Sequence, residues 1–136
     1  MPETTLVDAN VLLDVLTDDE RWAAWSGSAL SDAVDRGPVA INQVVYAEVS
    51  VRFSRVEELE QVLPAEVFAR ESLPWEAAFL AAKAHAAYRR RGGTRTATLP
   101  DFFIGAHAAV RGYALLTRDA RRYRTAFPRL RLVAPS

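Results

Sequence analysis

Short apolar runs alternate with longer amphipathic stretches along the whole chain. The apolar runs are rich in Val, Leu, Ile and Ala and have the length of buried strands. They occupy residues 4–7, 39–42, 67–73, 113–117 and 130–133. Helical patterns fill the intervals, at residues 9–16, 18–36, 43–53, 56–63, 75–91, 100–111 and 119–127. This alternation predicts an α/β fold with a parallel sheet of four to five strands, right-handed crossovers and helices on both faces.

Length and residue usage narrow the class of protein. The 136 residues are expected to form one domain, 1–136. The absence of cysteine excludes disulfides, thiol catalysis and thiolate zinc sites, and two histidines are few for a histidine-based metal centre. No stretch has the length of a membrane span, and the first residues lack a secretory pattern. We therefore expect a cytoplasmic protein with no membrane partner.

The net charge of zero conceals an uneven distribution of charged residues. Fifteen acids and six bases precede Arg89, whereas eleven arginines and only two acids, Asp101 and Asp119, follow from there on. A GC-rich genome would explain the excess of arginine over lysine, but not this clustering. Arginine suits bidentate contact with phosphate, so the last third of the chain predicts a basic face for nucleic acid. The run Arg89-Arg90-Arg91 also fits a plain helix end, since two glycines follow it.

Four acidic residues occupy positions that a parallel sheet brings to one edge. Asp8 follows the first strand, and Asp119 follows the strand at 113–117. Asp101 lies in the first turn of a helix, and Glu48 lies early in the helix after the second strand. Strand C-termini and helix N-termini share one edge of such a sheet, where ligands bind. Carboxylates gathered there repel one another and must protonate or hold cations, for which Mg²⁺ or Mn²⁺ is suited. A cation so held can activate water for attack on a phosphodiester.

Each acid also has a simpler structural explanation. Asp8, Asp101 and Asp119 could each be an ordinary helix cap or first-turn acid. Glu48 is the most informative single position, because a Glu within a largely apolar helical segment needs a reason. The remaining polar candidates receive no chemical role: Asp14, Asp18 and Asp19 are expected to be solvated or capping, His85 and His107 structural, and Lys83 solvated. Only the combination of four acids favours a site.

The ordered set of motifs resembles the PIN domain family, and within it the VapC-type toxins of toxin–antitoxin pairs. The matching segments are Val7-Asp8-Ala9-Asn10, Tyr46-Ala47-Glu48-Val49, Leu99-Pro100-Asp101-Phe102, Leu116-Thr117-Arg118-Asp119 and a tail from Arg121 to Pro135. The resemblance implies a three-layer α/β/α sandwich spanning the whole chain. It also implies a Mg²⁺- or Mn²⁺-dependent ribonuclease acting on RNA, often structured RNA such as tRNA or rRNA.

The resemblance also assigns roles to individual residues and partners. It implies that Asp8, Glu48, Asp101 and Asp119 are the catalytic, metal-binding set, with Asp8 and Asp101 closest to the metal and Asn10 and Thr117 supporting them. A homodimer and a VapB-type antitoxin are implied as partners, with the helix of Trp22 and Trp25 as the candidate antitoxin contact. Candidates for contact with the RNA backbone are Arg89, Arg90, Arg91, Arg95 and Arg118.

Two other functions remain open from the sequence. The first is an RNA-binding or interaction module without chemistry, for which the basic last third would suffice. The second is a phosphoaspartate or phosphatase-type domain with Asp8 as nucleophile, although Lys83, the sole lysine, is badly placed to assist it. A dinucleotide-binding enzyme is disfavoured because no Gly-rich loop follows the first strand.

Overall fold

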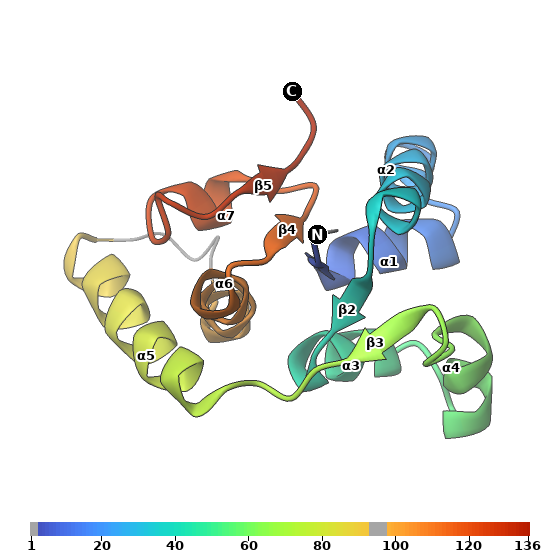
Figure 1. Cartoon of the computed structure of the whole chain (residues 1–136), viewed down its shortest axis with the longest axis horizontal. Helices are drawn as coiled ribbons and strands as arrows, with labels where there is room; N and C mark the ends of the chain where they lie inside the picture. The colour runs from blue at the N-terminus through green and yellow to red at the C-terminus, as the bar shows by residue number, and fades with distance from the viewer. Residues whose placement is uncertain (1–2, 93–97) are drawn as a thin grey trace.

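A parallel sheet forms the centre of the molecule. The computed structural model describes residues 3–92 and 98–136, which form five strands in the order β3-β2-β1-β4-β5 (Figure 1). The strands are β1 Thr5–Val7, β2 Val39–Ile41, β3 Phe68–Arg70, β4 Ala114–Leu116 and β5 Leu132–Val133. Every neighbouring pair is parallel. The predicted parallel sheet is therefore confirmed.

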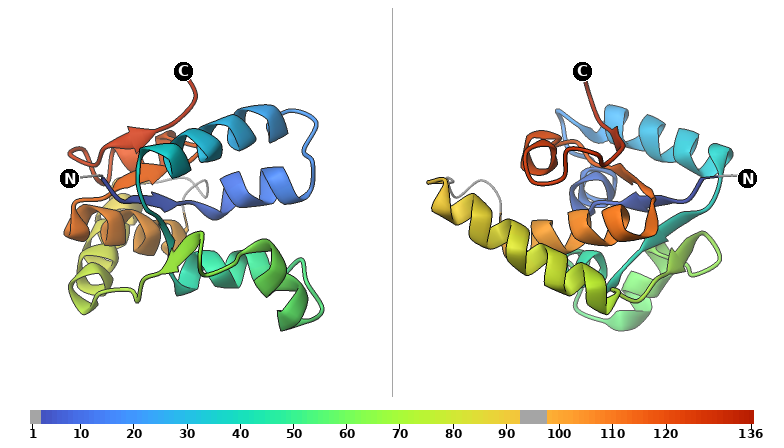
Figure 2. Two further views of the ribbon diagram at one scale, coloured as in Figure 1. Left: turned by 45° about the vertical axis from the view of Figure 1, so that its right-hand side comes forward. Right: turned by 60° about the vertical axis from the view of Figure 1, so that its left-hand side comes forward.

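Helices cover both faces of this sheet. They are α1 Ala9–Leu16, α2 Ala23–Arg36, α3 Gln43–Ser50, α4 Val56–Val62, α5 Trp75–Arg90, α6 Leu99–Arg111 and α7 Arg121–Arg124. The paired helices α1 and α2 lie on one side, whereas α5, α6 and α7 lie on the other (Figure 1). Figure 2 shows α5 running beside α6, with its C-terminal turns extending past it. The three-layer α/β/α arrangement agrees with the prediction. In the described segments, no helix combines the length and apolar character needed to span a membrane.

Several element boundaries differ from those predicted. Helix α2 begins at Ala23 rather than at Asp18, because Asp18 has a φ of 49° in the left-handed region and breaks the helical path. Asp19 caps the turn, as predicted, by accepting hydrogen bonds from the backbone N–H groups of Arg21 and Trp22. Helix α7 ends at Arg124 rather than near Phe127, since a proline at 128 disfavours helical backbone at the residue before it. Strands β3 and β5 are shorter than predicted.

The strand register positions the first candidate acid. Leu6 pairs with Ala40 of β2 and with Leu115 of β4, and all three side chains are fully buried. The hydrogen bonding continues one residue beyond β1, where the backbone N–H of Asp8 donates to the carbonyl of Leu116 at 2.8 Å. Asp8 is therefore fixed at the C-terminal edge of the central strand before α1 begins.

A buried polar contact joins the start of α3 to α6. Asn42 caps α3 by accepting the backbone N–H of Val45 on Oδ1, so its Nδ2 faces Nδ1 of His107 at 2.9 Å. Because the amide nitrogen can only donate, Nδ1 of His107 accepts, and the ring carries its proton on Nε2. Burial lowers the pKa of His107 and favours this neutral form. The structural role predicted for His107 agrees with this arrangement.

Helix α6 approaches the α7 segment closely at Gly105. A Cβ atom at this position would lie 2.5 Å from Cε2 of Phe127 and 3.0 Å from Cδ1 of Tyr123. Both rings are buried, so neither can move aside freely. The missing side chain of Gly105 is thus what allows the C-terminal segment to pack on α6.

We expect Gly105→Ala to destabilise the fold. Overpacking by one methyl costs about 1–3 kcal/mol, which exceeds the gain in helix propensity of up to about 1 kcal/mol. Gly27 in α2 is the matched control, because a Cβ there would meet nothing within 4 Å, and Gly27→Ala should be neutral or stabilising. Urea unfolding of both variants measures the difference. Equal stability of Gly105→Ala and Gly27→Ala would contradict the packing argument.

Candidate metal centre

Asp8 is a buried carboxylate that does not act as a helix cap. It occupies the cap position of α1, yet its side chain makes no capping hydrogen bond. Its Oδ2 instead accepts hydrogen bonds from Thr117 Oγ1 and Tyr123 Oη, each at 2.8 Å. Burial raises the pKa of Asp8, the two hydroxyl groups oppose that rise, and the charge of Asp101 adds to it. The capping explanation therefore fails for Asp8.

Asn10 and Thr117 form a hydrogen-bonded link beside Asp8. Asn10 Nδ2 donates to Thr117 Oγ1 at 3.3 Å, and Asn10 Oδ1 accepts the backbone N–H of Arg118. Thr117 Oγ1 also accepts the backbone N–H of Asp119 at 3.1 Å while donating to Asp8. These contacts tie the start of α1 to the loop that follows β4. They orient Asp8 and Asp119 relative to each other.

Asp101 is both a capping residue and a member of the acidic group. Its Oδ2 accepts the backbone N–H of Thr98 at 2.8 Å, while the Thr98 hydroxyl oxygen accepts the backbone N–H of Asp101, and together these bonds form a capping box at the start of α6. The Thr98 hydroxyl also lies 3.1 Å from Oδ2 and donates to it. The other oxygen of Asp101, Oδ1, faces Nη1 of Arg122 at 3.3 Å. The carboxylate is buried, so the contact with Arg122 supplies charge compensation.

Glu48 has a buried carboxylate oxygen without a partner and a raised pKa. Its Oε1 is buried, and no described residue offers it a hydrogen bond. Loss of hydration, followed by the charges of Asp8 and Asp101, raises the pKa of Glu48 to about 7. A buried polar atom without a partner is rare in folded proteins and indicates a missing ligand or a functional role.

Two residues of this site escaped the sequence analysis. Arg122 makes ion pairs with Asp101 and, through Nε at 2.9 Å, with Asp119, whose side chain is about one-third exposed. Tyr123 is fully buried and donates to Asp8. The i, i+3 spacing of Asp119 and Arg122 was a visible sign of the first contact. Tyr123 looked like an ordinary aromatic core residue.

The chemistry of the donor set suits a hard divalent cation, although its geometry is not that of a finished ligand sphere. The charge of Asp101 contributes to the raised pKa of Asp8, and the charges of Asp8 and Asp101 contribute to that of Glu48. Across residues 3–92 and 98–136, however, no three acid or histidine side chains are grouped tightly enough to hold one ion. Asp101 and Asp119 are turned toward Arg122 instead. The oxygen donors and the unpartnered Oε1 of Glu48 nevertheless fit Mg²⁺ or Mn²⁺.

The expectation that Asp14 is solvated or capping was wrong. Asp14 is buried, its Oδ2 accepts from Ser26 Oγ at 2.8 Å, and it pairs with Nε of Arg118 at 2.8 Å. Arg118 lies 104 residues further along the chain, so the pairing could not be read from local pattern. The Arg118 guanidinium also lies 5.7 Å from the ring centre of Trp22.

The basic candidates occupy different environments. Arg118 keeps about one-third of its side chain exposed, and the run of arginines at 89–91 is exposed at the end of α5. Contact of these residues with RNA stays a prediction. Arg95 lies outside the described residues. Lys83 is exposed beside the ring of Phe79, as expected of a solvated lysine.

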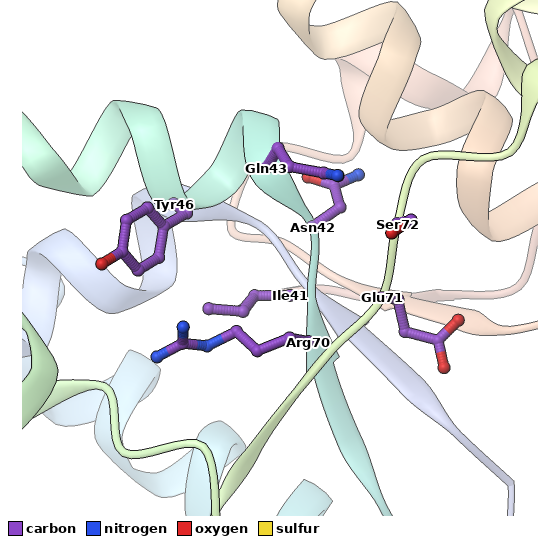
Figure 3. Close-up of a pocket in the computed structure, with 7 residues that line it drawn as sticks. All are labelled: Ile41, Asn42, Gln43, Tyr46, Arg70, Glu71 and Ser72. Carbon is purple, nitrogen blue, oxygen red and sulfur yellow. The ribbon is translucent and has the colours of Figure 1, made fainter.

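A separate pocket of about 250 Å³ opens at the C-terminal ends of β2 and β3 (Figure 3). Tyr46 and Arg70 lie side by side in it, and both contact Glu60. Gln43 accepts the backbone N–H of Leu73. None of the four candidate acids lines this pocket. We assign it no chemistry.

The raised pKa of Glu48 predicts a pH-dependent stability in protein treated with EDTA. Between pH 4.5 and about 7 the folded state holds a proton that the unfolded state has lost, so the stability falls as the pH rises through this window. Glu48→Gln lacks this group and should gain about 1–2 kcal/mol over the wild type between pH 5 and pH 8, a value reduced for solvent screening.

Urea unfolding at several pH values measures this gain. The exposed Glu66→Gln change is the control and should follow the wild type at every pH. A Glu48→Gln curve parallel to that of the wild type would show that Glu48 titrates as an ordinary solvated residue.

Comparison with known proteins shows which family and which solved structures this chain resembles. The family model described as PIN domain matches residues 5–128. The fold is similar to VapBC2 from Rickettsia felis bound to promoter DNA, with 15% identity, 96% of this chain and 98% of that chain covered, and a TM-score of 0.73. It is also similar to VapBC-1 from nontypeable Haemophilus influenzae, with 13% identity, coverages of 96% and 97%, and a TM-score of 0.74.

A toxin–antitoxin complex from Klebsiella pneumoniae shares 22% identity over 97% of this chain and 98% of its own, with a TM-score of 0.65. At such identities these likenesses establish the fold alone. No curated protein sequence gave a significant match. The match over residues 5–128 covers nearly the whole chain, including all four candidate acids, and we conclude that the chain belongs to the PIN domain family.

Proposed function

We propose that this protein is a VapC-type toxin, a Mg²⁺- or Mn²⁺-dependent endoribonuclease that hydrolyses RNA phosphodiester bonds. The observation that carries the proposal is the buried, unpartnered Oε1 of Glu48 beside the buried Asp8 and Asp101. PIN domains are generally nucleases, and the similar solved structures are toxin–antitoxin complexes. The carboxylates repel one another unless a cation is bound, and a cation held in this way suits the hydrolysis of phosphodiester bonds.

In this proposal the residues that hold the cation are Asp8, Glu48, Asp101 and Asp119. When bound, the cation supplies positive charge to the phosphate oxygens and makes water a better nucleophile near neutral pH. Thr117 and Tyr123 hold Oδ2 of Asp8, and Thr98 holds Oδ2 of Asp101. Each of these two carboxylates is thereby held through one oxygen, and the other oxygen is assigned to the cation.

Glu48 is assigned to the attacking water. Its buried Oε1 has no partner among the described residues and can accept a hydrogen bond from that water molecule. Burial of that oxygen strengthens its hydrogen bond to a water molecule that reaches it. Asp8 and Asp101 are assigned the closest contacts with the metal, as the resemblance implies, and Glu48 and Asp119 bind a second ion or orient the water.

The partners belong to the same proposal. The exposed Arg89, Arg90 and Arg91 and the half-buried Arg118 supply positive charge for an RNA backbone, with structured RNA such as tRNA or rRNA as the substrate class. A VapB-type antitoxin is expected to neutralise the enzyme, with the Trp22 and Trp25 pair at the start of α2 as a contact. These rings are half-buried and meet edge to face at 6.4 Å. We place the protein in the cytoplasm as a homodimer.

The competing functions fit the site less well. A phosphate-accepting Asp8 would need a nearby lysine, whereas Lys83 is exposed on α5. A module that only binds RNA would have no use for a buried carboxylate oxygen without a partner. A metal-dependent nuclease needs no lysine beside Asp8 and has a use for the unpartnered oxygen of Glu48.

Cleavage assays test this proposal directly. Purified protein should cut RNA with Mn²⁺ or Mg²⁺ and stop with EDTA. Asp8→Asn and Asp101→Asn should each lower the rate by at least about 100-fold, the scale expected when one charged catalytic group is removed. Asp32→Asn, at an exposed site on α2, is the control and should cut at the wild-type rate. Undiminished cleavage by Asp8→Asn or in EDTA would refute the assignment.

A further inference from the structure

Arg122 places a positive charge among the candidate acids. Its Nη1 lies 3.3 Å from Oδ1 of Asp101, and its Nε lies 2.9 Å from Oδ2 of Asp119. Its charge also lowers the pKa of Asp8 and of Glu48, although less than burial raises each of them. Burial by itself would lower the pKa of Arg122, but the charges of Asp101, Asp119 and Asp8 raise it overall. One guanidinium therefore contacts two of the acids and acts on the other two through its charge.

The oxygen that Arg122 contacts on Asp101 is the one left for a ligand. Oδ2 of Asp101 is held by the backbone and hydroxyl of Thr98, so Oδ1 is directed to the site. Arg122 takes this oxygen and also one oxygen of Asp119. A divalent cation at the same two oxygens would be repelled by the guanidinium, because both groups are positively charged and bind the same two carboxylates.

The rest of α7 keeps Arg122 in this position while leaving it a way out. The neighbouring residue Tyr123 is fixed by its bond to Asp8 and by packing on Gly105. The side chain of Arg122 is about one-third exposed, so its guanidinium can turn toward solvent without unfolding the helix. The backbone is thus anchored, and the charged group is free to exchange partners.

We propose that Arg122 is a built-in counter-ion that competes with the divalent cation for Asp101 and Asp119. This inference rests on the proposed metal dependence and adds to it a residue that sets the affinity for the metal. Arg122 stabilises the acidic group when no divalent cation is bound, and it is expelled when the cation enters. The apparent affinity for the cation is then reduced by the fraction of molecules in which Arg122 holds the carboxylates.

Calorimetric titration of EDTA-stripped protein with Mn²⁺ tests the competition. Arg122→Gln should bind Mn²⁺ about tenfold more tightly than the wild type, since the competing ion pairs are gone. Arg121→Gln is the matched control, because it removes the same charge from an exposed position on the same helix and should change the affinity by less than about twofold. Equal or weaker binding by Arg122→Gln would overturn the inference.

Thermal unfolding supplies a second readout that does not depend on activity. In EDTA, Arg122→Gln should unfold at a lower temperature than the wild type, because buried Asp101 loses its counter-ion. Saturating Mn²⁺ should raise its unfolding temperature by more than it raises that of the wild type. An equal rise in the two proteins would count against competition.

The outcomes separate the two proposals. Absence of Mn²⁺ binding in every variant would refute the metal dependence itself, whereas wild-type binding with no gain in Arg122→Gln refutes only the role of Arg122. Should Arg122→Gln not fold, Arg122→Lys replaces it. Lysine keeps the charge but loses the two-pronged contact, so it should bind Mn²⁺ about two- to threefold more tightly than the wild type. Unchanged or weaker binding by Arg122→Lys would again overturn the inference.

Discussion

The burial of the Asp8 carboxylate is the constraint on which the rest of the site depends. An isolated charge at the end of β1 would be severely destabilising in the protein interior. Two hydroxyl groups, from Thr117 and Tyr123, offset this by donating to the same oxygen, and hydrogen bonds to a charged group stabilise by about 1.5–3 kcal/mol each. These bonds join β1 to the loop after β4 and to α7. The position of the C-terminal segment therefore depends on its hydrogen bonds to the Asp8 carboxylate.

The same principle extends to the other acids, each in its own way. Asp101 serves as a capping residue through Oδ2 and offers Oδ1 to the site, so the capping and the functional explanation are both correct for one side chain. Asp119 is oriented by the backbone contact to Thr117 and by Arg122. Glu48 alone has a buried oxygen with no partner in the described part of the chain. A capping role therefore explains part of the position of Asp101 only.

More of the fold than of the site could be predicted from the sequence. Apolar runs and helix signals located every strand and helix, and parallel topology placed the four acids at one edge. The residues that hold the acids were missed because their contacts connect distant segments. Tyr123 reads as a core aromatic, Arg122 as one of many arginines, and the partner of Asp14 lies 104 residues away. The left-handed backbone of Asp18 and the close approach at Gly105 are equally invisible to local pattern.

The hydrogen bond between Asp8 and Tyr123 spans 115 residues of a chain of 136. A polypeptide still being synthesised has its first strand long before it has Thr117, Asp119 or the tyrosine. Until those last residues emerge, the carboxylate of Asp8 has neither of its hydroxyl partners, and the acidic group is incomplete. The acidic site proposed for this protein can therefore be assembled only after Tyr123 has been synthesised.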